Sequence, residues 1–325
     1  MSQVLVPGNE GSSDPTQLRA EMDAWVSSQP FQAMVAAFGG PARNGSDLRS
    51  YLASLDRFTG GAWDFRAKRE RNLVDPELVS ADIEPEVLSA AEALGLVKPS
   101  PPQHHSYDYI LVLGGLVRAC VWRARYAALL APELHPKRVD GLTAFRRIGG
   151  DEPRLLKRFR LPALDSEHEI MAAALCRAFS LAAMPPRAQS SETVSTNSRW
   201  LLAEAVTSYG LTVGEVVAPS GEPESRRANS GDTYSFWAEQ MVALNPGARI
   251  LLVTSIIYVP HQHAAALEML GIPYGVVVNT VGVDPALVDD KRAPQAFRGV
   301  HYLQEFRSTV RSFASLERSL GFVTG

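Results

Sequence analysis

The stretch Tyr107–Cys120, YDYILVLGGLVRAC, decides the fold class. Within it, Tyr109–Gly114 is a short apolar run ending in paired glycines, which is typical of a strand buried on both faces of a parallel sheet. Gly114-Gly115 predicts a tight turn, because glycine adopts positive φ without steric cost. Good helix formers follow as far as Pro132. Together these features predict the opening of a βαβ unit, and in open α/β sheets ligands bind beside the carboxyl ends of the strands.

The composition is that of a folded protein without a strong charge. The chain has 325 residues, 46% of them hydrophobic and 21% charged, and its net charge is −3. This balance gives no general attraction to nucleic acid or to an anionic membrane. Cys120 and Cys176 lie in apolar helical patterns, so we expect buried thiols rather than a disulfide. The start of the chain lacks the layout of a signal peptide, and no apolar run reaches membrane-spanning length. We therefore expect a cytoplasmic, soluble protein that binds a small molecule. The sequence does not predict its oligomeric state.

The first hundred residues show helical patterns and no strand pattern. Asp14-Pro15 predicts a helix start, Ser46 can cap a second helix that runs through Leu55, and Pro85–Leu96 is expected to form a third. A proline-rich linker follows at Lys98–His105. We therefore predict a helical module over residues 1–103 and an α/β domain with a C-terminal helix over residues 104–325.

The α/β domain is predicted from a repeated order of strand, loop and helix. The expected strands after the first are Val139–Phe145, Arg249–Thr254 and Tyr274–Val278. Helices are expected after Asp165, after the polar cluster Ser195–Asn197, after Asn229–Thr233, and over Gln295–Leu320. Each unit is long enough for a right-handed crossover. The predicted fold is a doubly wound, mainly parallel sheet, a Rossmann-like α/β/α sandwich.

Polar residues follow the predicted strands and open the predicted helices. Arg146 and Arg147, next to a Gly-Gly loop, could hold a phosphate or carboxylate, although exposed loop arginines are common. Glu167 lies in the first turn of a helix, where the helix dipole alone favours acidic residues. The Asn229 helix start offers N–H donors to an anion, but helix capping explains it equally well. His261 is the residue we choose for proton transfer, since imidazole titrates near neutrality.

The common motifs of catalysis and metal binding are absent. The chain has no GxGxxG after the first strand, no GxxxxGK[ST] and no GxSxG, which argues against the dinucleotide, nucleotide triphosphatase and α/β-hydrolase classes. His104-His105 lies in the linker, and His261-x-His263 lacks a clear third ligand. We predict no metal site.

Four short motifs, in order, resemble the YdcF/SanA/ElyC-like proteins. They are LVLGG (Leu111–Gly115), DSEHEIM (Asp165–Met171), ANSGDT (Ala228–Thr233) and LLVTS (Leu251–Ser255), and the resemblance covers about Tyr107–Gly282. It implies a Rossmann-like sandwich and a site for a nucleotide-like or adenosyl-bearing molecule. S-adenosylmethionine is one ligand that the resemblance allows, and the cofactor stays unknown.

The chain departs from the family pattern at two places. Tyr258 and His261, followed by Gln262, stand where the family tends to have a His and an Arg. Ser230-Gly231 is an insertion between Asn229 and Asp232. The ligand, or the way it is bound, is therefore expected to differ from that of the family.

We predict an enzyme, a transferase or hydrolase, that acts on a small anionic, nucleotide-like or adenosyl-bearing molecule in a cleft at the carboxyl ends of the strands. The alternative is a non-catalytic binding or regulatory protein that uses the same cleft. The candidate catalytic residues are His261, Asp232 and Glu167. The candidate ligand-binding residues are Gly114, Gly115, Arg118, Arg146, Arg147, Asn229, Thr233, Thr254, Ser255, Tyr258 and Gln262.

Overall fold

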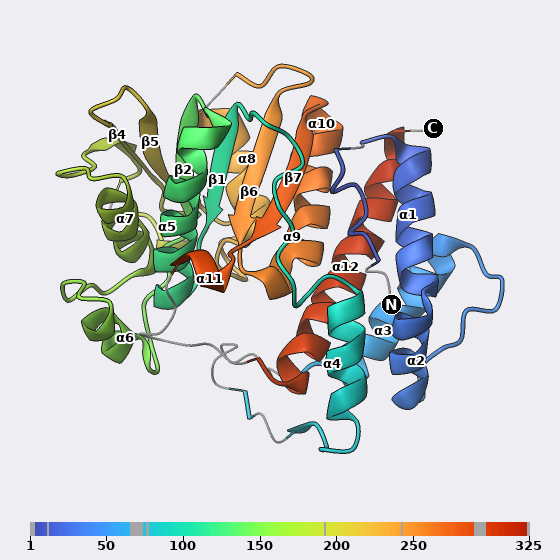
Figure 1. Cartoon of the computed structure of the whole chain (residues 1–325). Coiled ribbons are helices and arrows are strands. Elements are labelled where there is room, and N and C mark those ends of the chain that lie inside the picture. The colour runs from blue at the N-terminus through green and yellow to red at the C-terminus, as the bar shows by residue number, and fades with distance from the viewer. Residues whose placement is uncertain are drawn as a thin grey trace. The chain divides into compact units, whose positions relative to one another are not determined.

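The chain forms two compact units. The computed structural model describes residues 4–11, 13–65, 74–75, 78–191, 193–241, 243–288 and 297–323. The helical unit is drawn from Met1–Ser100, Ile256–Glu268 and Gln295–Gly325, and the sheet unit from Pro101–Ser255 and Met269–Pro294 (Figure 1). The last helix therefore groups with the N-terminal helices, whereas the sequence pattern assigned it to the α/β domain.

The helical unit contains seven named elements among the described residues. They are α1 (Pro15–Ser27), α2 (Gln29–Ala37), α3 (Leu48–Ala62), α4 (Glu84–Ala93), η4 (Ile256–Tyr258), α9 (Val259–Ala266) and α12 (Gly299–Val323). The predicted start of α1 is confirmed, because the Asp14 side chain accepts a hydrogen bond from the Gln17 N–H and Pro15 is the first helical residue. No helix in the described part of the chain is long and apolar enough to cross a membrane.

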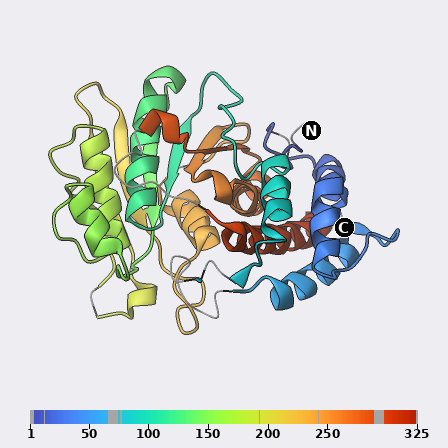
Figure 2. The same ribbon diagram turned by 60° about the horizontal axis from the view of Figure 1, so that its bottom comes forward.

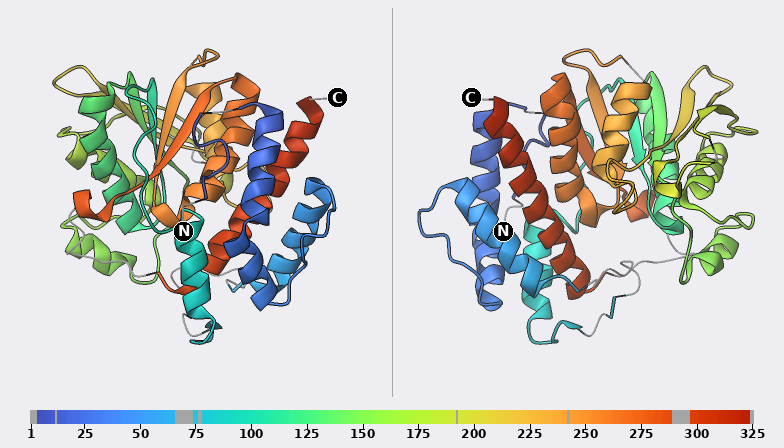
Figure 3. Two further views of the ribbon diagram at one scale, coloured as in Figure 1. Left: turned by 45° about the vertical axis from the view of Figure 1, so that its right-hand side comes forward. Right: turned by 180° about the vertical axis from the view of Figure 1, so that it is seen from behind.

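Aromatic side chains form the core of the helical unit. The Trp25 ring of α1 lies 5.0 Å from Phe31, 6.1 Å from Phe306 and 5.3 Å from Phe313, measured between ring centroids. All four residues are fully buried. Figures 2 and 3 show α12 (dark red) running along the N-terminal helices (blue). Residues almost 300 positions apart in the sequence thus share one core.

The sheet unit contains a seven-stranded sheet with the order β3-β4-β5-β2-β1-β6-β7. The strands are β1 (Tyr109–Leu113), β2 (Arg138–Thr143), β3 (Pro186–Gln189), β4 (Leu201–Val206), β5 (Thr212–Val217), β6 (Arg249–Thr254) and β7 (Val277–Gly282). Pairing is parallel from β5 to β7, whereas β4 is antiparallel to both β5 and β3. The predicted fold class, a mainly parallel α/β sheet with an N-terminal helical region, is confirmed.

The parallel strands have the strand order of a Rossmann-type sheet. Numbered along the chain without the β3–β4 pair, they read 3-2-1-4-5, the order found in doubly wound nucleotide-binding folds. Because the chain crosses from β5 back to β6 on the other side of β1, the switch point lies between β1 and β6. The carboxyl ends of these central strands are where such sheets bind ligands.

Helices cover both faces of this sheet. The helices and turns of the unit are α5 (Val117–Leu134), α6 (Glu152–Arg158), α7 (Glu167–Ala178), η3 (Thr196–Ser198), α8 (Ser230–Gln240), α10 (Ile272–Tyr274) and α11 (Pro285–Val288), and a π-helical turn, η5 (Leu267–Gly271), begins at the end of α9. Helices α5 and α7 pack on one face, with Ile110, Val112 and Val139 in the shared core (Figure 1). On the other face the Trp237 Nε1–H of α8 donates to Asp140 Oδ2 at 2.8 Å.

Three local predictions from the sequence are wrong. The residues after Ser195–Asn197 form strand β4 instead of a helix, because Leu201–Val206 pairs along its whole length with β5. The strand expected at Tyr274–Val278 runs instead from Val277 to Gly282, pairing with β6. Neither glycine of Gly114-Gly115 has positive φ, so the turn there does not need left-handed backbone.

Candidate active site

Gly114 lies at the carboxyl end of β1, where its N–H donates to Leu142 O of β2 at 2.8 Å. A Cβ atom at this position would lie 2.2 Å from Glu167 Oε1 and 2.7 Å from Leu142 O. Glycine is required here for the close approach of a carboxylate to the main chain, since real Cβ contacts are never this short. Gly114 thus makes room for a carboxylate at the carboxyl end of β1, and its contact with a ligand stays a prediction.

Arg146 organises the loop after β2. Its Nε donates to Glu167 Oε2 at 2.7 Å, and its Nη1 and Nη2 donate to Glu152 Oε2 and Oε1 at 2.8 and 2.9 Å. The remaining N–H groups donate to the main-chain carbonyls of Arg147 and Gly115. All five N–H donors of the guanidinium therefore have acceptors within the protein. Arg146 positions two glutamates, and the anion-binding candidate on this loop is Arg147, whose side chain is exposed.

The two glutamates come from helix starts next to this loop. Glu167 is the first residue of α7, and its N–H donates to Arg146 O at 2.8 Å. Ser166 and Glu169 form a capping box that fixes the start of α7. Glu152 begins α6 and accepts from the Val117 N–H of α5 at 3.3 Å. Internal carboxylates thus occupy donors that an anionic ligand would otherwise use.

The Glu167 carboxyl group is buried, and its pKa is perturbed. Burial raises its pKa above the ordinary value, and the nearby charge of Glu152 adds to this, while Arg146 and Arg227 act in the opposite direction. Its Oε2 is bonded to Arg146, and its Oε1, which lies against Gly114, has no hydrogen-bond partner among the described residues. The pKa of Arg146 is also raised: burial alone would lower it, but the hydrogen bonds and charges of Glu152 and Glu167 outweigh burial.

Another buried carboxyl group, that of Glu215, lies on the same face of the sheet. It is 2% exposed on β5, and its Oε1 accepts a long hydrogen bond of 3.4 Å from Thr143 Oγ1. Burial raises its pKa well above the ordinary value, and the charges of Glu167 and Glu169 add to the shift. Among the described residues, no three His, Cys, Asp or Glu side chains come together as a possible metal site.

The switch point between β1 and β6 is bridged by Arg123 of α5. This buried guanidinium donates to the carbonyls of Leu113 and Gly114 and, through Nη2, to Ser255 Oγ at 3.1 Å. Thr254 beside it is fully buried. Burial raises the pKa of the Cys120 thiol to about 12, so this cysteine is a packing residue, as the sequence predicted.

Aromatic and basic side chains stand around the same edge of the sheet. The ring of Phe145, just after β2, lies 4.9 Å from the His168 ring, and the Arg199 guanidinium carbon lies 4.8 Å from the centre of the Phe145 ring. Burial lowers the pKa of His168, which favours the neutral imidazole. Arg118, in contrast, stacks on Trp122 of its own helix at 5.6 Å.

The predicted residues at the start of α8 form a separate hydrogen-bonded network. Asn229 and Asp232 make a capping box, Asp232 Oδ1 accepts from the Gly221 N–H at 3.0 Å, and both carboxylate oxygens pair with Arg226. Burial would raise the pKa of Asp232, but these hydrogen bonds outweigh it and lower the pKa. The Thr233 hydroxyl donates to a carbonyl one turn back. These contacts tie α8 to the loop after β5, and a catalytic role for Asp232 stays a prediction.

Three predicted site residues belong to the helical unit. His261 Nδ1 lies 3.2 Å from Glu305 Oε2 of α12, and the ring of Tyr258 lies 5.8 Å from the His261 ring. Gln262 is buried in the same unit. That Tyr258, His261 and Gln262 line one cleft with Gly114 stays a prediction.

Sequence reasoning missed Glu152, Glu215, Arg123 and His168. A signal existed for Glu215, because a glutamate in the apolar run TVGEVV is unusual in a buried strand. Arg123 likewise interrupts the buried face of α5. No sequence signal distinguishes Glu152 and His168, because both lie at helix starts, where polar residues are expected.

Comparison with known proteins identifies the family. The uncharacterized protein Rv3785 of Mycobacterium tuberculosis is 30% identical over 335 residues, which cover 96% of this chain and 92% of that protein. The uncharacterized protein Mb3814 of Mycobacterium bovis matches to the same extent. This chain belongs to the Rv3785 family. The family model of the Rv3785 N-terminal domain matches residues 9–95, within the helical unit. No solved structure matches the chain.

The resemblance to YdcF/SanA/ElyC-like proteins is therefore wrong, since the matches point to the Rv3785 family. Each of the four motifs has a local structural cause. LVLGG ends the central strand, DSEHEIM and ANSGDT carry capping boxes, and LLVTS ends β6. Strand ends and helix caps of this kind recur in α/β proteins of different families, so the order of the four motifs does not identify a family. The expectation of an adenosyl-bearing ligand loses its support.

Proposed function

We propose that this protein is an enzyme, a hydrolase or group transferase, that uses Glu167 for general acid–base catalysis on a small anionic molecule. The observation that carries the proposal is the Glu167 carboxyl group. It is buried, its pKa is raised, one oxygen is held by Arg146, and the other lies against Gly114 at the carboxyl end of the central strand. A carboxyl pKa that is raised toward the working pH suits proton transfer in both directions.

The geometry supports a base with a fixed orientation. Arg146 Nε holds Glu167 Oε2 at 2.7 Å, and Glu152 holds the other edge of the same guanidinium. This leaves Oε1 as the oxygen that can accept a proton. In the proposed reaction a water or substrate hydroxyl gives its proton to Oε1 while its oxygen forms a bond to the electrophilic centre. The bond to the leaving group then breaks, and the leaving group takes the proton from Glu167.

Arginines on the neighbouring loops support an anionic substrate. Arg147 follows β2 and is exposed, and the charge of Arg227, on the loop between β5 and α8, acts on Glu167. Guanidinium groups bind carboxylate and phosphate through paired hydrogen bonds. A substrate whose anionic group pairs with one of these arginines would have its reacting centre near Oε1.

The test compares three full-length proteins incubated with a metabolite extract, with mass spectrometry before and after. They are the natural protein, Glu167→Gln, and the control Glu169→Gln. Glu169 lies two residues away in the same helix, and glutamine keeps a capping box intact. We expect the natural protein and the control to consume the same molecule, and Glu167→Gln to do so at least ~100-fold more slowly.

The outcomes separate the two candidate functions. If Glu167→Gln turns over the molecule as fast as the natural protein while its melting temperature is unchanged, Glu167 is not the base and the proposal fails. A molecule retained by all three proteins in stoichiometric amount, without product, would instead establish a binding protein.

A further inference from the structure

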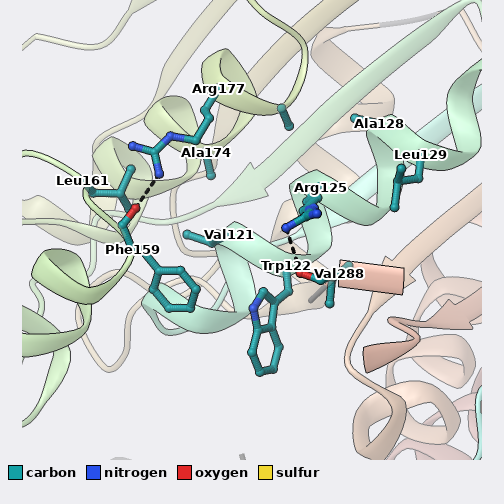
Figure 4. A pocket seen from close by; sticks show the side chains of 11 residues that line it. Val121, Trp122, Arg125, Ala128, Leu129, Phe159, Leu161, Ala174, Arg177 and Val288 are labelled. Carbon is teal, nitrogen blue, oxygen red and sulfur yellow. Dashed lines mark hydrogen bonds between the residues drawn. The ribbon is translucent and has the colours of Figure 1, made fainter. Parts of the chain in front are cut away.

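A groove lies on the outer side of the two helices that cover the α5–α7 face of the sheet. It has a volume of about 400 Å³ and is lined from α5, α7, α11 and the residues that follow α6 (Figure 4). This is within the range of ~300–1,000 Å³ that is usual for small-molecule sites. None of Arg146, Glu152, Glu167 and Glu215 lines this groove.

The walls of the groove are apolar. Trp122 and Phe159 stand edge to face with their ring centroids 6.4 Å apart, and Val121 and Val288 lie beside them. Leu129 on the rim is 47% exposed. Apolar walls of this kind remove the hydrocarbon part of a ligand from water, which stabilises binding roughly in proportion to the area covered, at ~25 cal/mol per Å².

Two arginines stand at the groove, one on each helix. Arg125 of α5 donates to Val288 O at 2.9 Å, and Arg177 of α7 donates to Phe159 O (Figure 4). Arg177 also donates to the carbonyl of Arg160. These bonds hold the guanidinium groups in place but use neutral acceptors. Within the described ranges neither arginine has a carboxylate partner. Both side chains are exposed and keep further N–H donors.

We propose that this groove binds an amphiphilic carboxylate, a molecule with one hydrocarbon chain and one carboxylate group. The hydrocarbon chain lies against Trp122 and Phe159, and the carboxylate pairs with Arg125 or Arg177. Two positive charges, for which no counter-charge is described, lie beside the apolar walls of the groove. Charge complementarity therefore favours a carboxylate over a neutral lipid or a cationic amphiphile. The site is independent of the proposed catalytic reaction.

The experiment is isothermal titration of the full-length protein with dodecanoate below its micelle concentration, and with dodecanol as the uncharged analogue. Three variants probe the groove: Arg125→Gln, Arg177→Gln and Ala128→Leu. Arg154→Gln, an exposed arginine of α6 outside the groove, is the matched control.

We expect dodecanoate to bind the natural protein and the control equally, and dodecanol to bind at least ~10-fold more weakly, since a charged hydrogen bond is lost. At least one arginine variant should weaken dodecanoate binding by a similar factor. Ala128→Leu should weaken dodecanoate binding at least ~10-fold by narrowing the groove, with an unchanged melting temperature. This variant keeps the test decisive if Arg177→Gln loosens the end of α6.

Three results would overturn the proposal. Absence of dodecanoate binding excludes the ligand class, and equal affinity for dodecanol excludes recognition of the carboxylate. Undiminished binding by Ala128→Leu and by both arginine variants places the binding elsewhere on the protein.

Discussion

At the residue scale, the candidate site depends on glycine at position 114, which has no side chain. Gly114 leaves room for Glu167 Oε1 against the main chain of β1. A buried carboxylate next to a backbone carbonyl is costly unless a cation pairs with it, and Arg146 supplies that cation. The glycine, the glutamate and the arginine therefore depend on one another.

Replacement of Gly114 by alanine should displace Glu167. The added Cβ would lie 2.2 Å from Glu167 Oε1 and 2.7 Å from Leu142 O, and the latter is backbone that cannot move aside. We expect the free energy of unfolding to fall by about 1–3 kcal/mol, as for other overpacked sites. Gly149→Ala is the control, because its Cβ would meet open space. Equal stability of the two variants in urea denaturation would contradict this role of Gly114.

Glu215 should make the protein less stable as the pH rises. The unfolded chain loses this proton near pH ~4.3, whereas the folded protein keeps it to higher pH because burial raises the pKa. Between these two pKa values the folded state binds more protons, so the free energy of unfolding falls by up to about 1.4 kcal/mol per pH unit. Glu215→Gln removes this contribution. The hydrogen bonds from Arg298 lower the pKa of Glu84 to about 2, so Glu84 does not titrate in the pH range where Glu215 changes the stability.

Urea denaturation of the natural protein and of Glu215→Gln between about pH 5 and 8 measures this effect. The stability of the variant relative to the natural protein should increase with pH. Glu133→Gln, an exposed position on α5, should show no such trend. Parallel pH profiles for the natural protein and Glu215→Gln would show that Glu215 ionises normally.

At the element scale, similar local signals lead to different structures. Asn229 opens a helix and accepts a hydrogen bond from the Asp232 N–H at 3.1 Å. Ser195 precedes only a single 3-10 turn, and its hydroxyl bonds the Ser198 hydroxyl at 2.9 Å without capping the backbone. The next residues, Leu201–Val206, are good helix formers, yet they pair with β5. Tertiary pairing overrides helix propensity there.

These two positions should respond differently to alanine. Asn229→Ala removes a helix cap and should lower the free energy of unfolding by about 1 kcal/mol. Ser195→Ala removes an exposed contact between two hydroxyls and should change it by less than about 0.5 kcal/mol. Thermal unfolding of both variants is the measurement. A cost for Ser195→Ala equal to that of Asn229→Ala would mean that the residues after Ser195 depend on a helix cap.

At the scale of the whole molecule, the helical unit is assembled from three separate stretches of the chain. Phe306 and Phe313 of α12 complete the core around Trp25. Arg298, just before α12, pairs through two hydrogen bonds of 2.7 and 2.9 Å with Glu84 of α4. The region matched by the family model of the N-terminal domain, residues 9–95, thus lacks a large part of its own core.

A fragment of residues 1–100 should therefore fail to fold cooperatively. Without α12, Trp25 and Phe31 lose their partners, and an incomplete core cannot offset the entropy of ordering the chain. Circular dichroism should show a broad thermal transition, and addition of a peptide spanning residues 297–323 should increase the helical signal. A sharp transition of the fragment alone would show that this region is an independent domain.

Much of the fold follows from the sequence alone. The apolar run Tyr109–Gly114, the caps at Asp14 and Asn229, and the strand Arg249–Thr254 are local signals, and the structure contains each of them. The parallel sheet and its carboxyl edge follow from the repeated alternation of strand and helix. Local backbone preference and hydrophobic pattern operate over a few residues, and a sequence shows them directly.

The tertiary structure alone decides which polar residues meet. Arg146, Glu152 and Glu167 look like ordinary loop and capping residues, and only the folding of α6 and α7 back onto the carboxyl edge joins them into one buried cluster. The β4–β5 pairing and the return of α12 to the N-terminal helices have the same character. Contacts between residues far apart in the sequence depend on chain topology and on the burial of shared surface. A short stretch of sequence determines neither of these.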